Sequence, residues 1–495
     1  MFCKKNADIC INYAINNVRV DSNLDFELNK SITNQPKIMT NIQSTLQVEK
    51  KSAIVPMVIL TLLFFILGFV TWLNGPLIPF FELACELTSS QAYFVTFAFY
   101  IAYFVMAIPS SYIIEKVGYK NGISLGLLII AAGAFMFYPA ASSRTFLLFL
   151  IALFIMGTGL AVLQTASNPY VVVIGPRESA AARISVLGIA NKLAGFVAPI
   201  VLTVLVLSNM QDFTAEKIAL MDAAAKNAAL NSLALQLQTP YLYMGLIITV
   251  LALMVKFSPL PEIDLDEEGN VSNLSVFKQI KNAFRYPQLV LGVITLMLYL
   301  SAEVLAGDSI GAFGKQLGVY GEDGNFYLKL TSFTMSAMVI GYVLGIVLIP
   351  KYVSQVKALK VSGVLGIILV LAIVLISPKI MIAVPGTPDI PLVIFLVALL
   401  GLANALCWPA IWPMALQDLG GYTKIGSAIL IMGIIGGAVF PLFYGMLTES
   451  INADIVAKNM QNVSKSGNQI AYLMLLPSYI MILFYAIKGH KYRKW

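Results

Sequence analysis

Twelve apolar blocks of about 20 residues each, separated by charged or turn-rich breaks, most constrain the fold of this chain. A helix of about 20 apolar residues crosses the roughly 30 Å hydrocarbon core of a bilayer. Only 12% of the 495 residues are charged and 59% are hydrophobic, whereas soluble domains are roughly 25% charged. The sequence therefore predicts an all-α integral membrane protein with twelve transmembrane helices. The predicted spans are 53–75, 92–114, 121–141, 145–174, 183–208, 238–257, 288–313, 326–350, 359–378, 390–417, 425–447 and 470–488.

A hydrophilic stretch divides these helices into two groups of six. We expect a polar N-terminal tail at 1–52, a first half at 53–257, a linker at 258–287 and a second half with a short basic tail at 288–495. The linker opens with an acidic run and continues, from Leu274 to Arg285, as an amphipathic basic segment suited to a membrane interface. Lys and Arg concentrate in the tails and in alternate loops, which predicts that both termini are cytoplasmic.

The two halves echo one another. The fifth predicted helix contains Gly-Phe-Val-Ala-Pro at 195–199, and the eleventh contains Gly-Ala-Val-Phe-Pro at 437–441. Each run follows a proline-interrupted helix, with Pro169 in the fourth helix and Pro409 in the tenth. Two related six-helix halves with a central site are typical of the major facilitator fold.

Several motifs resemble the fucose–proton symporter family of the major facilitator superfamily. The resemblance covers about residues 55–490 and implies sugar transport, with features of a glucose/galactose branch. The motifs are Phe64–Pro79, Gln164–Tyr170 with Gly175 and Pro176 beyond, Glu115–Lys120 between helices two and three, Ser301–Val304, and Gly420–Ser427 with Gly436 and Gly437 beyond.

The chain departs from that family pattern at three positions. The pattern has an acid directly after the first-helix Asn, where this chain has Gly75, and fucose-type members have Glu where Gln164 stands. Lys192 replaces a small polar residue. Both acids that the resemblance associates with proton coupling are thus missing.

Polar side chains at membrane depth are the candidate sugar ligands. Gln164 and Asn168 lie one helical turn apart, and Asn191 is expected at a similar depth. Amides both donate and accept hydrogen bonds, which suits sugar hydroxyls, although such groups also join neighbouring helices. Asn74 is a further candidate, and so is an aromatic stripe at i, i+4 spacing in the tenth helix: Asn404, Trp408 and Trp412.

Two ionisable residues are candidates for ion coupling, because charges within the membrane are costly and usually functional. Lys192 lies about 14 Å into its predicted helix. It either stands in for a coupling ion or pairs with Glu303, the remaining protonatable carboxylate of the seventh helix. Asp308 is expected nearer the outer face, as a solvated residue of the mouth.

The sequence argues against other classes of protein. The single histidine, His490, lies near the C-terminus, and no catalytic or metal-binding motif is evident, so we expect no enzyme, cofactor or metal. No nucleic-acid module, channel filter or large sensor domain is evident either. We expect a monomeric secondary active sugar transporter of the inner membrane that moves a glucose- or galactose-like hexose by alternating access. Protons or sodium are possible coupling ions. Fucose or N-acetylglucosamine transport, and uncoupled uniport, stay open.

Overall fold

The computed structural model describes residues 55–173, 180–205, 217, 220–260, 262, 275–322, 324–349, 351–457 and 467–493. The predicted tail at 1–52, Gly175 and Pro176, and most of the acidic part of the linker lie outside the described residues. The chain divides into a unit Met1–Pro56 and a unit Met57–Trp495.

Twelve helices in the described residues are long and apolar enough to cross a membrane, which confirms the predicted number. They are Val55–Ala84, Ser89–Val117, Tyr119–Ser143, Phe146–Asn168, Arg183–Leu205, Ala223–Phe257, Pro287–Gln316, Phe326–Leu348, Gln355–Leu375, Leu392–Leu416, Gly420–Asp454 and Gly467–Ile487.

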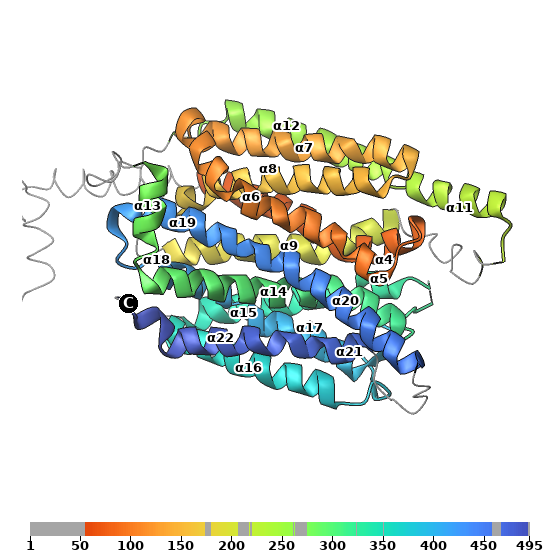
Figure 1. Cartoon of the computed structure of the whole chain (residues 1–495). Coiled ribbons are helices and arrows are strands. Elements are labelled where there is room, and N and C mark those ends of the chain that lie inside the picture. Colours follow the sequence, from red (N-terminus) through yellow and green to blue (C-terminus); the bar gives the residue numbers. More distant parts are fainter. Residues whose placement is uncertain are drawn as a thin grey trace, which may run out of the picture. The chain divides into compact units, whose positions relative to one another are not determined.

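The individual elements follow the chain in the order labelled in Figure 1. The α-helices are α4 (Asn74–Ala84), α5 (Ser89–Ala92), α6 (Phe94–Val117), α7 (Tyr119–Ser143), α8 (Phe146–Val173), α9 (Ala180–Leu205), α11 (Ala223–Leu235), α12 (Gln238–Phe257), α13 (Val276–Ala283), α14 (Pro287–Gln316), α15 (Thr331–Leu348), α16 (Gln355–Leu375), α17 (Leu392–Asn404), α18 (Cys407–Leu416), α19 (Thr423–Met432), α20 (Gly436–Ala457), α21 (Gly467–Ala471) and α22 (Leu476–Ile487). Short 3₁₀ helices are η3 (Phe326–Lys329), η4 (Gly420–Tyr422), η5 (Gly433–Ile435), η6 (Tyr472–Leu475) and η7 (Gly489–Lys491). Strands β1 (Met381–Ile382) and β2 (Ile390–Pro391) form a small antiparallel hairpin.

Three predicted spans were too short. The first helix continues to Ala84, because the Gly75-Pro76 pair lies in the first turn of α4, where a missing N–H leaves no intrahelical bond unmade. The sixth span begins at Ala223, because α11 leads into it; the Asp222 side chain caps α11 by accepting a hydrogen bond from Ala225 N at 2.7 Å. The eleventh continues beyond the predicted residue 447 as α20.

The two halves share one hydrophobic core cluster and meet along several helix pairs. In the first half, α7 contacts α8 and α12, and α8 contacts α6; in the second half, α14 contacts α17, α18, α20 and α22. Contacts between the halves include α9 with α15, α6 with α20 and α19, α5 with α20, and α4 with α14; α9 with α15 and α6 with α20 can be followed in Figure 1.

The two Gly-x-x-x-Pro runs take equivalent places in these junctions. A Cβ on Gly195 of α9 would lie 3.0 Å from Met335 of α15, and one on Gly437 of α20 would lie 3.3 Å from Tyr100 of α6. Each glycine therefore lets its helix approach the opposite half closely. The internal echo in the sequence has a structural counterpart.

Helix interruptions occur where the cavity described below forms. The first span has a turn at 72–73, and the tenth has one at 405–406 between α17 and α18. Pro409 has no N–H to bond the carbonyl of Ala405, which accounts for the second interruption.

At one end of the helices, α13 runs across the direction of the spans and contacts α19 (Figure 1). It occupies the segment predicted to be amphipathic. At the other end, α11 extends beyond α7 and α12 (Figure 1).

Candidate functional site

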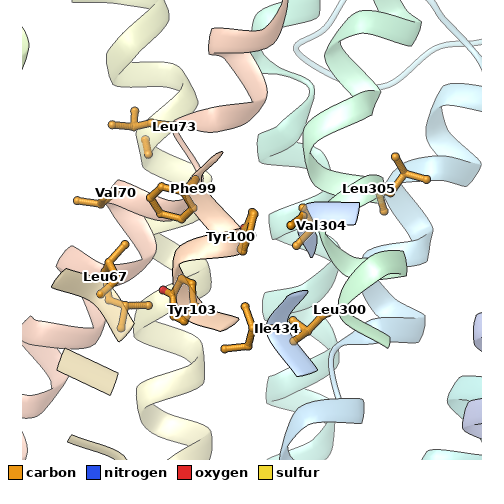
Figure 2. Packing of buried hydrophobic residues seen from close by; sticks show 14 of the residues in the cluster. Leu67, Val70, Leu73, Phe99, Tyr100, Tyr103, Leu300, Val304, Leu305 and Ile434 are labelled. Atoms are coloured by element: carbon orange, nitrogen blue, oxygen red, sulfur yellow. The ribbon is translucent and has the colours of Figure 1, made fainter. Parts of the chain in front are cut away.

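A cavity of about 130 Å³ lies between the two halves. Seven of the nine residues proposed from the sequence line it: Gln164, Asn168, Asn191, Lys192, Glu303, Trp408 and Trp412. Both halves contribute, and so do both interrupted spans. Figure 2 shows the apolar packing beside it, with Tyr100 of the first half facing Val304 of the second.

An ion pair joins the halves at this cavity. Lys192 Nζ of α9 donates to Glu303 Oε1 of α14, which confirms the pairing predicted as one of two alternatives. The side chains are only 9% and 5% exposed. Tyr299 OH, one turn before Glu303 on α14, donates to the other carboxylate oxygen, Oε2. The Lys192 ammonium also lies 4.7 Å from the ring centroid of Trp72, a cation–π distance.

The amide side chains of the first half lie on the cavity wall with unused hydrogen-bonding capacity. Gln164 Oε1 and Asn168 Nδ2 are buried atoms without a hydrogen-bond partner among the described residues. Asn191 Nδ2 makes a long bond of 3.4 Å to the Phe64 carbonyl. The unpaired acceptor of Gln164 and the unpaired donor of Asn168 lie one helical turn apart on α8. A sugar hydroxyl, which both donates and accepts hydrogen bonds, can bind to either.

The second half contributes an aromatic surface. The rings of Trp408 and Trp412 in α18 have centroids 5.1 Å apart and an interplanar angle of 25°, so they are stacked. Both are half-buried and line the cavity, which agrees with the predicted i, i+4 stripe. Indole rings in such a wall offer an apolar face to the C–H side of a pyranose, as well as a polar N–H.

Two predicted sugar ligands lie outside the cavity. Asn404 Oδ1 accepts a hydrogen bond from Tyr479 OH at 3.0 Å, and the residue is fully buried at the end of α17. Asn74, which is 1% exposed, begins α4 beyond the turn at 72–73. Sugar contact by these two residues stays a prediction.

Sequence reasoning overlooked the tyrosines of the wall. Tyr100 and Tyr103 of α6, Tyr299 of α14 and Tyr342 of α15 all line the cavity and are buried. Their hydropathy is intermediate and the chain has 22 tyrosines, so composition alone does not distinguish these four. The i, i+4 spacing of Tyr299 and Glu303 was the one available signal.

The expectation for Asp308 was wrong. It is 0% exposed rather than solvated, because α4, η3 and α15 pack against this part of α14. Thr96 Oγ1 of α6 donates to its Oδ2 at 3.1 Å.

The cavity reaches one end of the helices and is closed towards the other. Its wall includes Val171, two residues before the end of α8, and Pro413, three residues before the end of α18. In the opposite direction it includes nothing of α14 beyond Val304. The layer beyond, with Thr96 and Asp308, is fully buried.

Twelve apolar helices in two halves, around a cavity that is lined by apolar and polar side chains and is accessible from one end, define a multi-pass membrane transporter rather than an enzyme. The chain belongs to the Major Facilitator Superfamily, whose family model matches residues 60–443, and within it to the fucose–proton symporter family.

Similar proteins support this assignment. A protein of Brucella abortus named glucose/galactose transporter is 34% identical over 432 residues, 87% of this chain and 93% of the relative. The L-fucose-proton symporter of Escherichia coli is 29% identical over 81% of this chain and 89% of its own length. The crystal structure of FucP, a major facilitator transporter in the outward conformation, matches with a TM-score of 0.67 and 26% identity, over 88% of this chain and 98% of that one.

Proposed function

We propose that this chain is a secondary transporter that moves a hexose of the glucose or galactose type by alternating access. One observation carries the proposal: a cavity between the halves that combines orphan amide groups with a stacked indole pair. The amides address hydroxyls and the indoles address the C–H face of the ring. Relatives named for glucose and galactose at 34% identity, against 29% for a fucose symporter, favour this substrate class.

The sugar-contact residues in this proposal are Gln164, Asn168, Asn191, Trp408 and Trp412, which line the cavity. Asn74 and Asn404 complete the predicted set, as residues whose contact depends on the opposite conformation. The Lys192–Glu303 pair remains the predicted coupling candidate within the cavity. Because the pair is neutral as a whole, it binds a polar uncharged ligand without leaving a lone charge in the membrane.

Alternating access follows from the arrangement of the halves. They meet at helix pairs that include α9 with α15 and α6 with α20, and rocking about such junctions opens the closed end and closes the accessible one. In the proposed orientation both termini are cytoplasmic, as the distribution of Lys and Arg predicts. The accessible end, where α8 ends and α9 begins, then faces the cytoplasm. We place the protein in the inner membrane as a monomer.

Uptake of labelled sugars into proteoliposomes tests the proposal. Glucose, galactose, fucose and N-acetylglucosamine are compared with and without imposed proton and sodium gradients, using the full-length protein and protein-free liposomes. Uptake of glucose or galactose that the other of the two competes away supports the proposal. Uptake of fucose or N-acetylglucosamine alone would replace the substrate, and equilibration that ignores both gradients would indicate a uniporter. No movement of any of the four would refute sugar transport.

A further inference from the structure

A second carboxylate lies buried in α14, five residues beyond Glu303. Asp308 is 0% exposed, and its one hydrogen bond among the described residues comes from Thr96 Oγ1 to Oδ2, at 3.1 Å. The other oxygen, Oδ1, is buried without a hydrogen-bond partner in the described part of the chain. A carboxylate accepts about four hydrogen bonds when ionised, so Asp308 is far from satisfied in that form.

Asp308 forms no ion pair among the described residues, although η3, which packs against α14, carries Tyr327 and Lys329. From α6 it faces Thr96 and Tyr100, and Tyr93 lies at the start of that helix. From η6, Tyr472 OH bonds the adjacent Ser309 at 2.6 Å. The charged groups on the same helix are engaged elsewhere: Lys315 pairs with Glu82 of α4 at 3.7 Å, and Glu303 pairs with Lys192.

The two carboxylates of α14 therefore differ in how their negative charge is compensated. Both oxygens of Glu303 are occupied, one by the Lys192 ammonium and one by Tyr299 OH, so its negative charge is balanced. Asp308 has one neutral donor and no cation. Burial without a partner charge disfavours the ionised form of a carboxyl group, and the group binds a proton instead.

Asp308 also occupies the layer that must open when the transporter changes state. The cavity wall ends at Val304 on α14 and at Tyr100 on α6. Asp308 and Thr96 each lie four residues, or about one helical turn, further towards the closed end. Their hydrogen bond joins the two halves, so opening this end separates the pair and admits water to the carboxyl group.

The closed layer has no space for another carboxylate at its centre. A Cβ on Gly75 of α4 would lie 2.7 Å from Thr331 Oγ1 and 3.5 Å from the Asp308 Cα. In this conformation the first span therefore meets α14 backbone to backbone. Among the described residues, Asp308 is the carboxyl group of this layer that is buried without a partner cation.

Tyr100 connects this layer to the cavity. It lines the cavity wall, its hydroxyl has no hydrogen-bond partner among the described residues, and it lies near both Asp308 and Glu303. A proton on Asp308 thus lies one aromatic side chain away from the sugar cavity.

We propose that Asp308 is the proton-binding group of the transport cycle, which binds a proton before its end of the transporter closes. When that end opens, Asp308 exchanges its proton with the water outside; when the cavity is accessible from the other end, the proton leaves past Tyr100. The step transfers a proton only, between the carboxylate and water. The inference rests on the proposed sugar transport and names the group that couples it to a proton gradient.

Proteoliposome assays with four proteins test the inference: wild type, Asp308→Asn, Thr96→Val and Asp389→Asn. Asp389 is an exposed carboxylate in the turn before β2, so its variant controls for the chemical change itself. Each protein is assayed for sugar exchange at equal pH on both sides, for accumulation driven by a proton gradient, and for the pH dependence of uptake. Exchange needs no net proton movement.

Wild type and Asp389→Asn are expected to accumulate hexose when the proton gradient is imposed. Asp308→Asn is expected to keep exchange and to lose accumulation, because the amide cannot release a proton. Thr96→Val removes the hydrogen bond that stabilises the ionised carboxylate, so the midpoint of the pH profile rises by about one pH unit. A purely structural role for Thr96 would lower the rate without moving that midpoint.

Three results would overturn the inference. One is gradient-driven accumulation by Asp308→Asn at the wild-type level. Another is wild-type uptake that ignores the proton gradient, which would leave sugar transport itself intact. If Asp308→Asn fails even in exchange, the Thr96→Val profile decides, and an unchanged midpoint refutes the inference. A wild type that moves no hexose would instead refute the proposed function, and the inference with it.

Discussion

Breaking the Lys192–Glu303 pair from either side is expected to destabilise the protein, whereas replacing both residues is expected to be nearly neutral. Removing one partner of a buried ion pair costs about 3–5 kcal/mol, because the other charge is left uncompensated. The side chains here are 9% and 5% exposed, which places the pair in that class. Lys192→Met should therefore cost about 3–5 kcal/mol, since it leaves Glu303 with Tyr299 OH alone.

The reverse change is expected to cost less. Glu303→Gln leaves the Lys192 ammonium over the Trp72 ring at 4.7 Å, a contact that the wild type also makes, so the remaining charge keeps one favourable partner. The double variant Lys192→Met/Glu303→Gln should lie within about 1–2 kcal/mol of wild type, because neither charge remains. The double variant is thus expected to lose less stability than the two single variants lose together, and this difference is the coupling energy expected of two residues in direct contact.

Thermal stability of the purified protein in detergent measures these differences, as the fraction that stays monodisperse after heating. With an unfolding entropy of about 2.1 cal/mol/K per residue, about 440 residues give roughly 1 kcal/mol per degree, so Lys192→Met should lower the melting temperature by about 3–5 °C. Lys226→Met is the matched control, because its ion pair with Glu86 is 38% and 44% exposed and should contribute less than about 1 kcal/mol. If Lys192→Met loses no more than this control, or if the double variant loses the sum of the two single changes, the reasoning is wrong.

Three further predictions concern the cavity and its surroundings. Trp408→Ala should raise the KM for hexose uptake about tenfold and Trp408→Phe should raise it less, because a ring face remains; equal KM values for both would exclude stacking. Asn404→Ala should destabilise the protein by about 1–3 kcal/mol, since Tyr479 OH loses its acceptor, and a KM that stays at the wild-type value would remove Asn404 from the sugar site. Gly68→Ala should cost about 1–3 kcal/mol in thermal stability, because its Cβ would lie 2.1 Å from the Asn191 carbonyl oxygen, and an unchanged melting temperature would contradict this packing.

Most of the fold could be predicted from the sequence, because a membrane span is a local signal. About 20 consecutive apolar residues predict a transmembrane helix, whatever that helix packs against. The predicted span ends that were wrong are those that depend on turns and helix caps rather than on hydropathy. The Ala-rich α11 carries Lys226 and Asn227 on a largely exposed surface, so its hydropathy does not indicate a membrane span. Asp222 is a residue typical of a helix N-cap, but an N-cap alone indicates where a helix begins and not that the helix continues into the next span.

The sequence predicts the partner of a site residue where the cost of burying a charge determines it. It does not predict which side chains pack around a residue. Lys192 and Glu303 were paired from the sequence because two lone charges in a membrane are prohibitive. Asp308 was misplaced because depth along a helix does not reveal which neighbours cover it. Asn404 shared a predicted face with Trp408, but the turn at 405–406 separates their helices, and its amide bonds Tyr479 instead.

The structure separates the two electrostatic tasks of a coupled transporter along α14. At Glu303 the charge is balanced by Lys192 inside the cavity, so this region can bind a neutral sugar and reorient without any change in charge. At Asp308, one turn beyond the cavity wall, the charge is not balanced, and its state depends on whether the layer is closed. A deprotonated Asp308 therefore opposes closure of its layer, since burial would leave an uncompensated carboxylate in the membrane. Closure with a proton bound is the favoured path, and release of that proton past Tyr100 on the other side then links sugar movement to a proton gradient without an acid at position 75 or 164.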